Sequence, residues 1–460
     1  MIAIVVSRAD RASTHIGEQL LEVAEWDERV DEDRPDEAGG GTYYRRPGFE
    51  LREFAELHIE LSDPTPAFGG PDEEPDLLAF VSRHSGETGA LLTAHFTGNF
   101  GPAEYGGRDG ELARAAPAAQ KRLVDAFERH APEGYEVGIE GTHHGPSETA
   151  VPSLFVELGS GDAQWDDPDG ARAVAEAVLD LEGTGPDLVG ADGRPRHVVG
   201  FGGGHYTPRF TRIVAETAWA VGHVGVDWQL AELGAPAANP DVIERAFERS
   251  RADLAVVDGD RPDLVATVED LGHRVVSETW VREVGDRPLA LIAALEDAVG
   301  SVDEGLRFGE RSVPVERGDE PAAVRDRFVV RSLPAALLER AQGVDADAAR
   351  AAVEAHTLAF DSEQAGTRAA GDAAFADPAD RDALVAALAD VLRDAYAAVS
   401  VEPDAVVARE EAFDPSLAAK LGVPEGPKFG RLASGEAVSV DGREIPPEEV
   451  RREREVKFER

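Results

Sequence analysis

Histidine lies close to glycine or hydroxyl residues in several short motifs, each of which follows an apolar run or a predicted helix. Histidine together with carboxylates can bind Zn²⁺, which lowers the pKa of a bound water to about 7 and makes it a nucleophile. Histidine alone can instead act as a general base toward water. No HExxH motif is present, so the spacing does not choose between these chemistries. The motifs are SRHS (82–85), TAHFTGNFG (93–101), EGTHHGPSE (140–148), GFGGGHYTPRFT (200–211) and GHVGVDW (222–228).

The adjacent pair His143 and His144 is the clearest sign of a functional site, because the chain has only 12 histidines. Neighbouring side chains in extended chain point to opposite sides, so we expect one of the two to enter a pocket and the other to orient it. The candidate catalytic residues are His84, His143, His144 and His205. The candidate metal ligands are His84, His144, His205 and Glu148, with Glu140 and Glu157 as further carboxylates nearby.

For the remaining histidines a structural role stands beside the functional one. A lone histidine at a surface or at the edge of a core is the expected interpretation for His15, His58, His130 and His197. Both interpretations stay open for His95 and His223.

The glycine run at 202–204 predicts close approach of the backbone to a ligand. Glycine has no side chain to obstruct that approach, and successive N–H groups can face an anion or a developing oxyanion. The run lacks the GxGxxG spacing, so a dinucleotide fingerprint is not supported, and a tight strand-to-helix turn is an equally good interpretation. The candidate substrate-binding residues here are Gly202, Gly203, Gly204 and Tyr206, whose ring can stack on a base or simply pack.

The composition limits both the chemistry and the environment. The formal net charge is −44 over 460 residues, and only four lysines are present, a pattern that resembles cytosolic proteins of salt-loving archaea. The absence of cysteine excludes disulfides, a thiol nucleophile and thiolate metal sites, so a metal would need His, Asp and Glu ligands. The apolar run of MIAIVVSRAD (1–10) is too short for a signal peptide, and no run reaches the ~20 apolar residues of a membrane span. We therefore expect a soluble cytoplasmic protein.

Strand and helix patterns alternate through the first three-fifths of the chain, which predicts an α/β fold with a mixed, largely parallel sheet flanked by helices. Ligands bind outside the carboxyl ends of such strands, so parallel strands would bring the four candidate histidines to one rim. The expected strands are Ile2–Val6, Leu77–Val81, Leu91–Phe96, Tyr135–Ile139, Leu154–Leu158, His197–Phe201, Asp253–Val257 and Arg274–Ser277. The expected helices are 10–26, 117–131, 168–182, 208–221, 239–250 and 261–271.

The amino-acid composition changes near residue 285, which divides the chain into a catalytic region (1–285) and an accessory extension (286–460). The extension is rich in Ala, Asp and Leu, and we expect it to be mainly helical, with a helix that starts at Asp377 and Pro378. Residues 421–450 are turn-rich. The acidic and Gly-rich residues 27–48 predict a solvated loop.

Taken together and in order, the motifs resemble the archaeal and plant-type D-aminoacyl-tRNA deacylase family over about residues 1–285. The resembling stretches are SRHS with LLTAHFTGNFG and YGG, then THHGPSE, VPSLFVELGS, GGGHYTPRFT and GH at 222–223. The resemblance implies hydrolysis of the ester between a D-amino acid and the 3′ end of a tRNA. It also implies zinc, as one or two ions per chain, and a fold similar to phosphorylase/peptidyl-tRNA hydrolase-like domains. We expect a monomer with tRNA as its partner and no membrane contact.

Substrate recognition by such an enzyme needs a filter for chirality and a surface for RNA. A steric wall that excludes the L side chain is the expected filter, with Phe96, Phe100 and Tyr105 as its candidates. Arg209 is a further candidate substrate-binding residue. Arginines can pair bidentately and stack, which offsets the acidity of the chain at an RNA contact. The candidates for this basic mouth are Arg45, Arg46, Arg108, Arg122, Arg209 and Arg212.

Two other functions stay open from the residues alone. One is a zinc-dependent peptidase, amidase or nucleosidase-like hydrolase on the same fold, and the other is a non-catalytic RNA-binding protein. The segment EGPKFGRLASGEAVSVDGREI (425–445) is similar to a stretch of the tRNA 3′-processing endonuclease Z, whose HxHxDH metal motif is absent here. A tRNA contact and a structural cap are both compatible with that segment.

Overall fold

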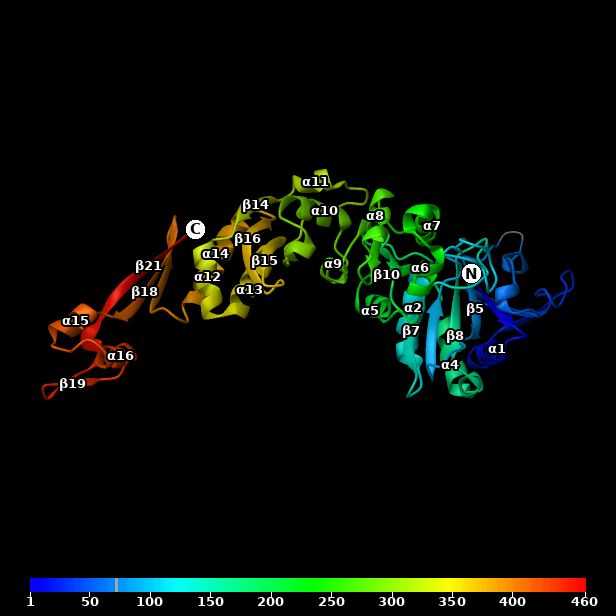
Figure 1. The fold of residues 1–460 in the computed structure, drawn as a ribbon, viewed down its shortest axis with the longest axis horizontal. Coiled ribbons are helices and arrows are strands. Elements are labelled where there is room, and N and C mark those ends of the chain that lie inside the picture. Colours follow the sequence, from blue (N-terminus) through cyan, green and yellow to red (C-terminus); the bar gives the residue numbers. More distant parts are fainter. Residues whose placement is uncertain (71–72) are drawn as a thin grey trace. The chain divides into compact units, whose positions relative to one another are not determined.

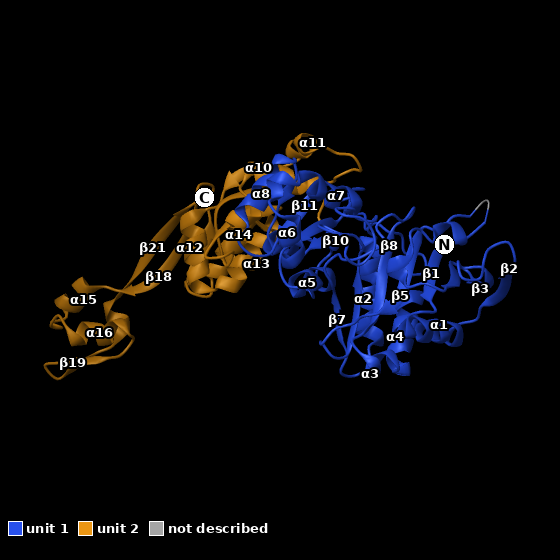
Figure 2. Ribbon diagram, turned by 45° about the vertical axis from the view of Figure 1, so that its right-hand side comes forward, with its two compact units in different colours: residues 1–286 blue, residues 287–460 orange. Residues whose placement is uncertain are grey.

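A computed structural model of the chain describes residues 1–70 and 73–460 (Figure 1). The chain forms two compact units, residues 1–286 and 287–460, which Figure 2 shows in different colours. Every candidate residue of the histidine motifs lies in the first unit. Among the described residues, no helix combines the length and the apolar character that crossing a bilayer requires.

The first unit is built on an eight-stranded mixed sheet of order β2-β3-β4-β1-β5-β8-β6-β7. Strands β4, β1, β5 and β8 are parallel, whereas β6 runs antiparallel to β8, and β7 is parallel to β6. The strands are β1 (Ile2–Ser7), β2 (Asp27–Asp31), β3 (Gly41–Arg46), β4 (Phe49–Phe54), β5 (Leu77–Arg83), β6 (Leu91–His95), β7 (Glu136–Ile139) and β8 (Ser153–Gly159).

The two faces of this sheet have different covers, because successive side chains of a strand point to opposite sides. Helices α1, α2 and α4 pack on one face and form its core with the alternate residues Ile2, Ile4 and Val6 of β1. The other face carries Phe80 and Phe155 and is covered by residues 54–68. The helices are α1 (Arg11–Val23), α2 (Pro117–His130), α3 (Asp162–Trp165) and α4 (Pro168–Leu179).

A second, four-stranded sheet of order β10-β9-β11-β12 completes the first unit, and all of its strands are parallel. Its strand β9 leads into the glycine run and His205. The strands are β9 (His197–Phe201), β10 (Ala220–Gly225), β11 (Leu254–Val257) and β12 (Arg274–Val275). The helices are α5 (Pro208–Glu216), α6 (Asp227–Leu233), α7 (Pro240–Ser250), α8 (Pro262–Asp270) and α9 (Glu278–Val284).

The predicted fold class is confirmed, and each of the eight expected strands is present with small shifts at its ends. Three details differ. The expected loop at 27–48 contains the β2–β3 hairpin, whose β2 side chains are mostly exposed, so no apolar pattern marked it. The expected helix 208–221 ends at Glu216, and Ala220 begins the buried strand β10. The parallel arrangement that we assumed for the histidine-bearing strands does not hold for β6 and β7.

The second unit contains more strand than expected from its composition, which favoured helix. Strands within residues 307–375 form a four-stranded antiparallel sheet with helices packed against it, and a second sheet joins β17 (Ala398–Val401), β18 (Ala405–Phe413) and β21 (Arg451–Glu459). The expected helix after Asp377 is present as α14, and Asp377 caps it. The helices are α10 (Leu289–Ala298), α11 (Pro321–Arg325), α12 (Ala335–Val344), α13 (Ala346–His356), α14 (Pro378–Leu392), α15 (Pro415–Lys420) and α16 (Pro427–Ala433).

The sequence predicted a mainly helical second unit and did not predict most of the strands that the structure shows there. Alanine, a strong helix former, fills half of the eight positions of β16, so the composition of this segment favoured a helix. The strands are β13 (Arg307–Phe308), β14 (Val329–Ser332), β15 (Ala359–Glu363), β16 (Arg368–Phe375), β17 (Ala398–Val401), β18 (Ala405–Phe413), β19 (Val438–Val440), β20 (Arg443–Ile445) and β21 (Arg451–Glu459). The turn-rich residues 421–450 belong to a small core of their own, which includes Leu432 and Val450.

Candidate functional site

A cavity of about 320 Å³ opens on the sheet face that residues 54–68 cover. Side chains from segments that are far apart in the sequence line it. These segments include the ends of β1 and β5, the middle of β8, and the loops after β7 and β9. The lining residues are Asp10, Leu57, His58, Ile59, Ser82, Arg83, His84, Ser85, Tyr105, Glu140, His143, His144, Phe155, Glu157 and His205. The four histidines proposed from the sequence therefore lie around one cavity.

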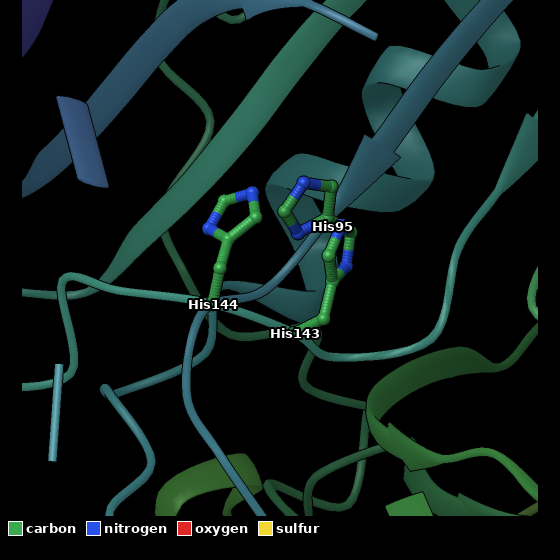
Figure 3. Close-up of side chains that lie close together, drawn as sticks. All are labelled: His95, His143 and His144. Carbon is green, nitrogen blue, oxygen red and sulfur yellow. The ribbon is translucent and has the colours of Figure 1, made fainter. Parts of the chain in front are cut away.

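Three imidazoles form the first possible ligand group of this site. His95 ends strand β6, and His143 and His144 follow from the loop after β7, so that the three rings face one another (Figure 3). The ring centroids of His95 and His143 are 4.1 Å apart, and those of His95 and His144 are 4.8 Å apart. One ring nitrogen from each residue lies within 4.8 Å of the others, close enough to hold one metal ion.

Hydrogen bonds fix the tautomer of these three rings. Nδ1 lies 3.0 Å from the Phe96 carbonyl oxygen in His95, 2.9 Å from that of Gly141 in His143, and 2.8 Å from that of Gly145 in His144. A carbonyl oxygen only accepts, so each Nδ1 carries a proton, and in the neutral form of each ring Nε2 then keeps its lone pair. Metal-binding histidines commonly have this arrangement, in which a backbone carbonyl orients the ring.

A carboxylate between two imidazoles forms the second group. Oε2 of Glu140 lies 2.7 Å from Nε2 of His205 and 3.7 Å from Nε2 of His84. His84 follows β5, Glu140 follows β7 and His205 follows β9, so three separate strands bring them together. The two groups adjoin, because the rings of His143 and His205 are 4.8 Å apart.

The donor atoms of both groups suit a divalent metal such as zinc. Nε2 of His95 and Oε1 of Glu140 are buried, and neither has a hydrogen-bond partner within the part of the chain that the structure describes. Buried polar atoms without partners are costly, and a bound cation would satisfy both. Imidazole nitrogen and carboxylate oxygen are common zinc ligands, and the chain offers no thiolate.

The protonation states agree with ligand roles. Burial lowers the pKa of His144 to about 3 and that of His143 well below its usual value, with the neighbouring histidines adding repulsion, so both are neutral. Burial opposes ionisation of Glu140, but His205, His95 and His84 outweigh it and lower its pKa to about 2. Neutral imidazole and ionised carboxylate are the forms that bind metal.

Glu157 adds a second buried carboxylate beside the first group. Its Oε1 accepts a hydrogen bond from Ser82 Oγ at 2.7 Å and lies 3.5 Å from Nε2 of His95. Burial by itself lowers the pKa of His95, but Glu157 outweighs it and raises that pKa above the ordinary value.

Glu148, which we selected from the sequence as a metal ligand, is not brought to the histidines. Its carboxylate pairs with Nε of Arg108 at 2.5 Å, and the side chain is 47% exposed. Glu140 occupies the position in the site that we had assigned to Glu148. His95 also belongs to one of the two possible ligand groups, whereas the sequence had left both a structural and a functional role open for it.

The glycine run contributes less to the cavity than expected. The N–H of Gly202 donates to the carbonyl of Gly225 at 2.8 Å, so it is already occupied and cannot stabilise an oxyanion. The carbonyl of Gly204 accepts from the N–H of Thr207 within the strand-to-helix turn, and the carbonyl of Gly203 accepts from the N–H of Asp227, which follows β10. These hydrogen bonds hold the backbone of the protein together, as the structural interpretation of the glycine run expected.

Of the other substrate-binding candidates, only Tyr206 and Tyr105 lie at the site. The Tyr206 hydroxyl is 3.4 Å from Nε2 of His84, and Tyr105 lines the cavity with 66% of its surface exposed. Phe96 and Phe100 are buried in the core, where they pack on His223 and Phe201, so they cannot form the chiral wall.

The arginines expected at a basic mouth have other partners. Arg209 pairs with Asp258 and Glu278 at 3.2 Å each, and neither it nor the other candidates line the cavity. Arg83 is the arginine among the lining residues, and its guanidinium lies over the ring of Trp165. The remaining contacts are Arg45 with Glu50 and Glu73, Arg46 with Trp26, Arg108 with Glu148, Arg122 with the Asp180 carbonyl, and Arg212 with Glu278.

His58 and His223 have structural contacts. His58 is buried and lies 3.1 Å from the Val5 carbonyl, although its ring also lines the cavity, which the sequence did not predict. His223 is buried, with Nε2 2.8 Å from the Ala113 carbonyl and Nδ1 3.0 Å from the Thr142 hydroxyl.

The lowered pKa of the buried His223 predicts that the folded protein becomes less stable in mild acid. Burial lowers its pKa to about 4, against about 6.5 in an unfolded chain. Between these values the unfolded state takes up a proton that the folded state does not, so stability falls as the pH drops below 6.5, by about 2 kcal/mol at pH 5. Denaturant unfolding at pH 7 and pH 5 in high salt measures this loss. His223→Gln should show a smaller loss between the two pH values, and an unchanged loss would contradict the assignment.

The site is thus a buried set of imidazoles and carboxylates on an α/β sheet, and its donor atoms are of the types that divalent metal ions take as ligands. A family model described as D-aminoacyl-tRNA deacylase matches residues 71–276. The chain is 64% identical, over its whole length and 96% of the relative, to the D-aminoacyl-tRNA deacylase of Halorubrum lacusprofundi. The chain belongs to the D-aminoacyl-tRNA deacylase family, which confirms the resemblance inferred from its motifs.

Further comparisons agree with this membership. The deacylase of Natronomonas pharaonis is 53% identical over 100% of both chains, and that of Methanococcoides burtonii is 31% identical over 98% of this chain and 94% of its own. The crystal structure of AF0625, a conserved protein of unknown function, is 28% identical with a TM-score of 0.54, covering 63% of this chain and 99% of its own. It shares this α/β fold.

Proposed function

We propose that the chain hydrolyses the ester bond of D-aminoacyl-tRNA and releases the free D-amino acid and the tRNA. The observation that carries the proposal is the 64% identity, over the whole chain, to a relative named D-aminoacyl-tRNA deacylase. The cavity adds support, because histidines from the motifs that carry the resemblance line it. Its volume of about 320 Å³ suits the aminoacyl end of the substrate, with the RNA body outside.

We propose zinc as the cofactor, held as up to two ions per chain. His95, His143 and His144 would hold one ion, and His84, Glu140 and His205 would hold the other. When bound, such ions polarise an ester carbonyl and lower the pKa of a bound water. The second set replaces the ligand set proposed from the sequence, with Glu140 in place of Glu148.

The chain's own residues supply proton transfer and positioning. In this proposal Glu157, oriented by the Ser82 hydroxyl at 2.7 Å, takes the proton of the attacking water and returns it to the ribose 3′-oxygen. The Tyr206 hydroxyl beside His84 can donate to an oxygen of the substrate. Phe155, Ile59 and Tyr105 line the cavity and form the steric wall that selects the D configuration, in place of Phe96 and Phe100.

The composition of the chain and the names of its relatives support a proposal for the compartment, the oligomeric state and the substrate. We propose that the chain works in the cytoplasm, as a monomer, with tRNA as its substrate. The net charge of −44 with four lysines supports work in concentrated salt, where counterion release adds little to RNA affinity. Recognition would then depend on direct contacts to the terminal nucleotides and to the amino acid.

The peptidase or amidase interpretation is not favoured, because the relatives that match the chain along its whole length are named as deacylases of D-aminoacyl-tRNA. A non-catalytic RNA-binding role is weakened by the occupied arginines, since most of the candidates pair with acidic side chains.

A chirality-resolved assay tests the proposal. D-tyrosyl-tRNA and L-tyrosyl-tRNA are incubated with the purified chain in molar KCl, and the remaining ester is measured over time. We expect the D ester to be hydrolysed at least ~100-fold faster, which corresponds to about 2.7 kcal/mol of discrimination. Equal rates, or hydrolysis of a small peptide panel in place of the D ester, would refute the proposed function.

A further inference from the structure

Asp10 is a buried carboxylate on the wall of the cavity that the proposed mechanism does not use. It follows the carboxyl end of β1 and caps α1, where Oδ1 accepts from the Ser13 N–H at 3.2 Å. Oδ2 accepts from the N–H of Arg83 at 3.0 Å, across the neighbouring parallel strand. The residue is only 3% exposed, and it belongs to neither group of possible metal ligands.

Among the described residues Asp10 has no ion-pair partner, and the imidazole that interacts with it electrostatically, His58, is kept neutral by burial, which lowers its pKa to about 4. Across residues 1–70 and 73–460, no arginine, lysine or histidine nitrogen lies within the 4.0 Å that defines an ion pair with it. A carboxylate offers about four lone-pair sites, and two N–H groups use only two of them. Burying a carboxylate without a cation is costly, so an exogenous cation that enters the cavity would gain from this position.

The other carboxylates on the wall differ from Asp10 in this respect. Glu140 lies 2.7 Å from His205, and Glu157 lies 3.5 Å from His95, so both belong with the histidines. The cavity therefore has two possible ligand groups for metal and ester chemistry, and one carboxylate outside both groups that is free to bind a cation.

The substrate class brings one such cation. In an aminoacyl-tRNA the carboxyl group of the amino acid is esterified, so the α-ammonium is the charge that every amino acid retains. We propose that Asp10 binds the α-ammonium group of the D-aminoacyl moiety and so orients the α-carbon in the cavity. This inference rests on the proposed function and adds a substrate-binding residue to it.

Such a contact gives a physical basis for selecting one enantiomer. With the ester at the histidines and the ammonium at Asp10, two of the four substituents of the α-carbon are fixed. The side chain and the hydrogen then compete for two positions, and a steric wall can admit the side chain to only one of them. A wall without a fixed ammonium would allow the amino acid to rotate and fit in either configuration.

Binding of a substrate analogue that cannot be hydrolysed tests the inference without relying on turnover. The probes are 3′-deoxy-3′-(D-tyrosylamino)adenosine and its N-acetyl derivative, which has no positive charge, and calorimetry measures their Kd for the wild type and Asp10→Asn. Asparagine keeps the shape and the helix cap but removes the charge. We expect the wild type to prefer the free amine by about 10- to 100-fold, and Asp10→Asn to lose that preference.

Every outcome of this experiment decides the inference. Equal weakening of both probes by Asp10→Asn would show a structural role and overturn it, as would a wild type that binds both probes alike. Asp345→Asn, at the cap of α13 in the second unit, is the matched control and should bind as the wild type does. The proposed function is judged separately, by wild-type hydrolysis of D-tyrosyl-tRNA, and it stands even if the probes show no role for Asp10.

Discussion

His144→Ala is expected to lower kcat/KM for D-aminoacyl-tRNA by about 1,000-fold or more, which is about 4 kcal/mol of transition-state stabilisation. Nε2 of His144 keeps its lone pair and faces His95 and His143, so the substitution leaves two imidazoles where three could hold an ion. Zinc analysis of the purified variant should find one ion fewer per chain than in the wild type. Rates of ester hydrolysis and zinc content are measured on the same preparation.

The backbone at His144 calls for a second variant. Its φ of 48° lies in the left-handed region, which asparagine tolerates better than alanine. His144→Asn should therefore fold as well as the wild type while showing the same loss of rate and zinc. His356→Ala in the second unit, outside both ligand groups, is the matched control. Full activity in both His144 variants would remove this residue from the mechanism.

Glu140→Gln should lower kcat/KM by about 100- to 1,000-fold and remove the ion held with His84 and His205, while the ion of the His95 group stays. Glutamine preserves the shape of the side chain but not its charge. That charge is present at every physiological pH, because the surrounding histidines lower the pKa of Glu140 to about 2. Zinc content per chain, together with the hydrolysis rate, measures the effect.

Glu148→Gln is the matched control for Glu140, and it separates the structural assignment from the one made on sequence. Glu148 is half exposed and pairs with Arg108, so its substitution should leave rate and zinc content unchanged. If Glu148→Gln lost the ion and Glu140→Gln kept it, the second ligand group would be wrong.

The buried strands were predictable because parallel strands covered on both faces are continuous apolar runs, such as Ile2–Ser7 and Leu77–Arg83. The β2–β3 hairpin was not, since an edge pair with exposed polar side chains carries no such pattern. The first two residues of β10, Ala220 and Val221, were assigned to a helix because they follow the apolar pattern of α5 closely.

Glu140 and Glu148 show how the site was only partly predictable. The two carboxylates flank the histidine pair at three residues before and four residues after, so spacing did not separate them. The path of the loop decides between them: Glu140 directly follows Ile139, the buried last residue of β7, whereas Glu148 lies beyond the left-handed turn at His144 and meets Arg108.

The sequence by itself determined which chemical groups are available, namely imidazoles and carboxylates without thiols. It also determined the α/β order of elements, the acidity, and the family to which the motifs belong. Only the tertiary structure decided which donors meet, placing His95 with the histidine pair, Glu140 between His84 and His205, and Asp10 on the wall outside both groups. The physical reason is that contact depends on strand direction and register. Because β6 runs against β8, His95 lies opposite Phe155 in the middle of that strand, and no spacing along the chain encodes this neighbour.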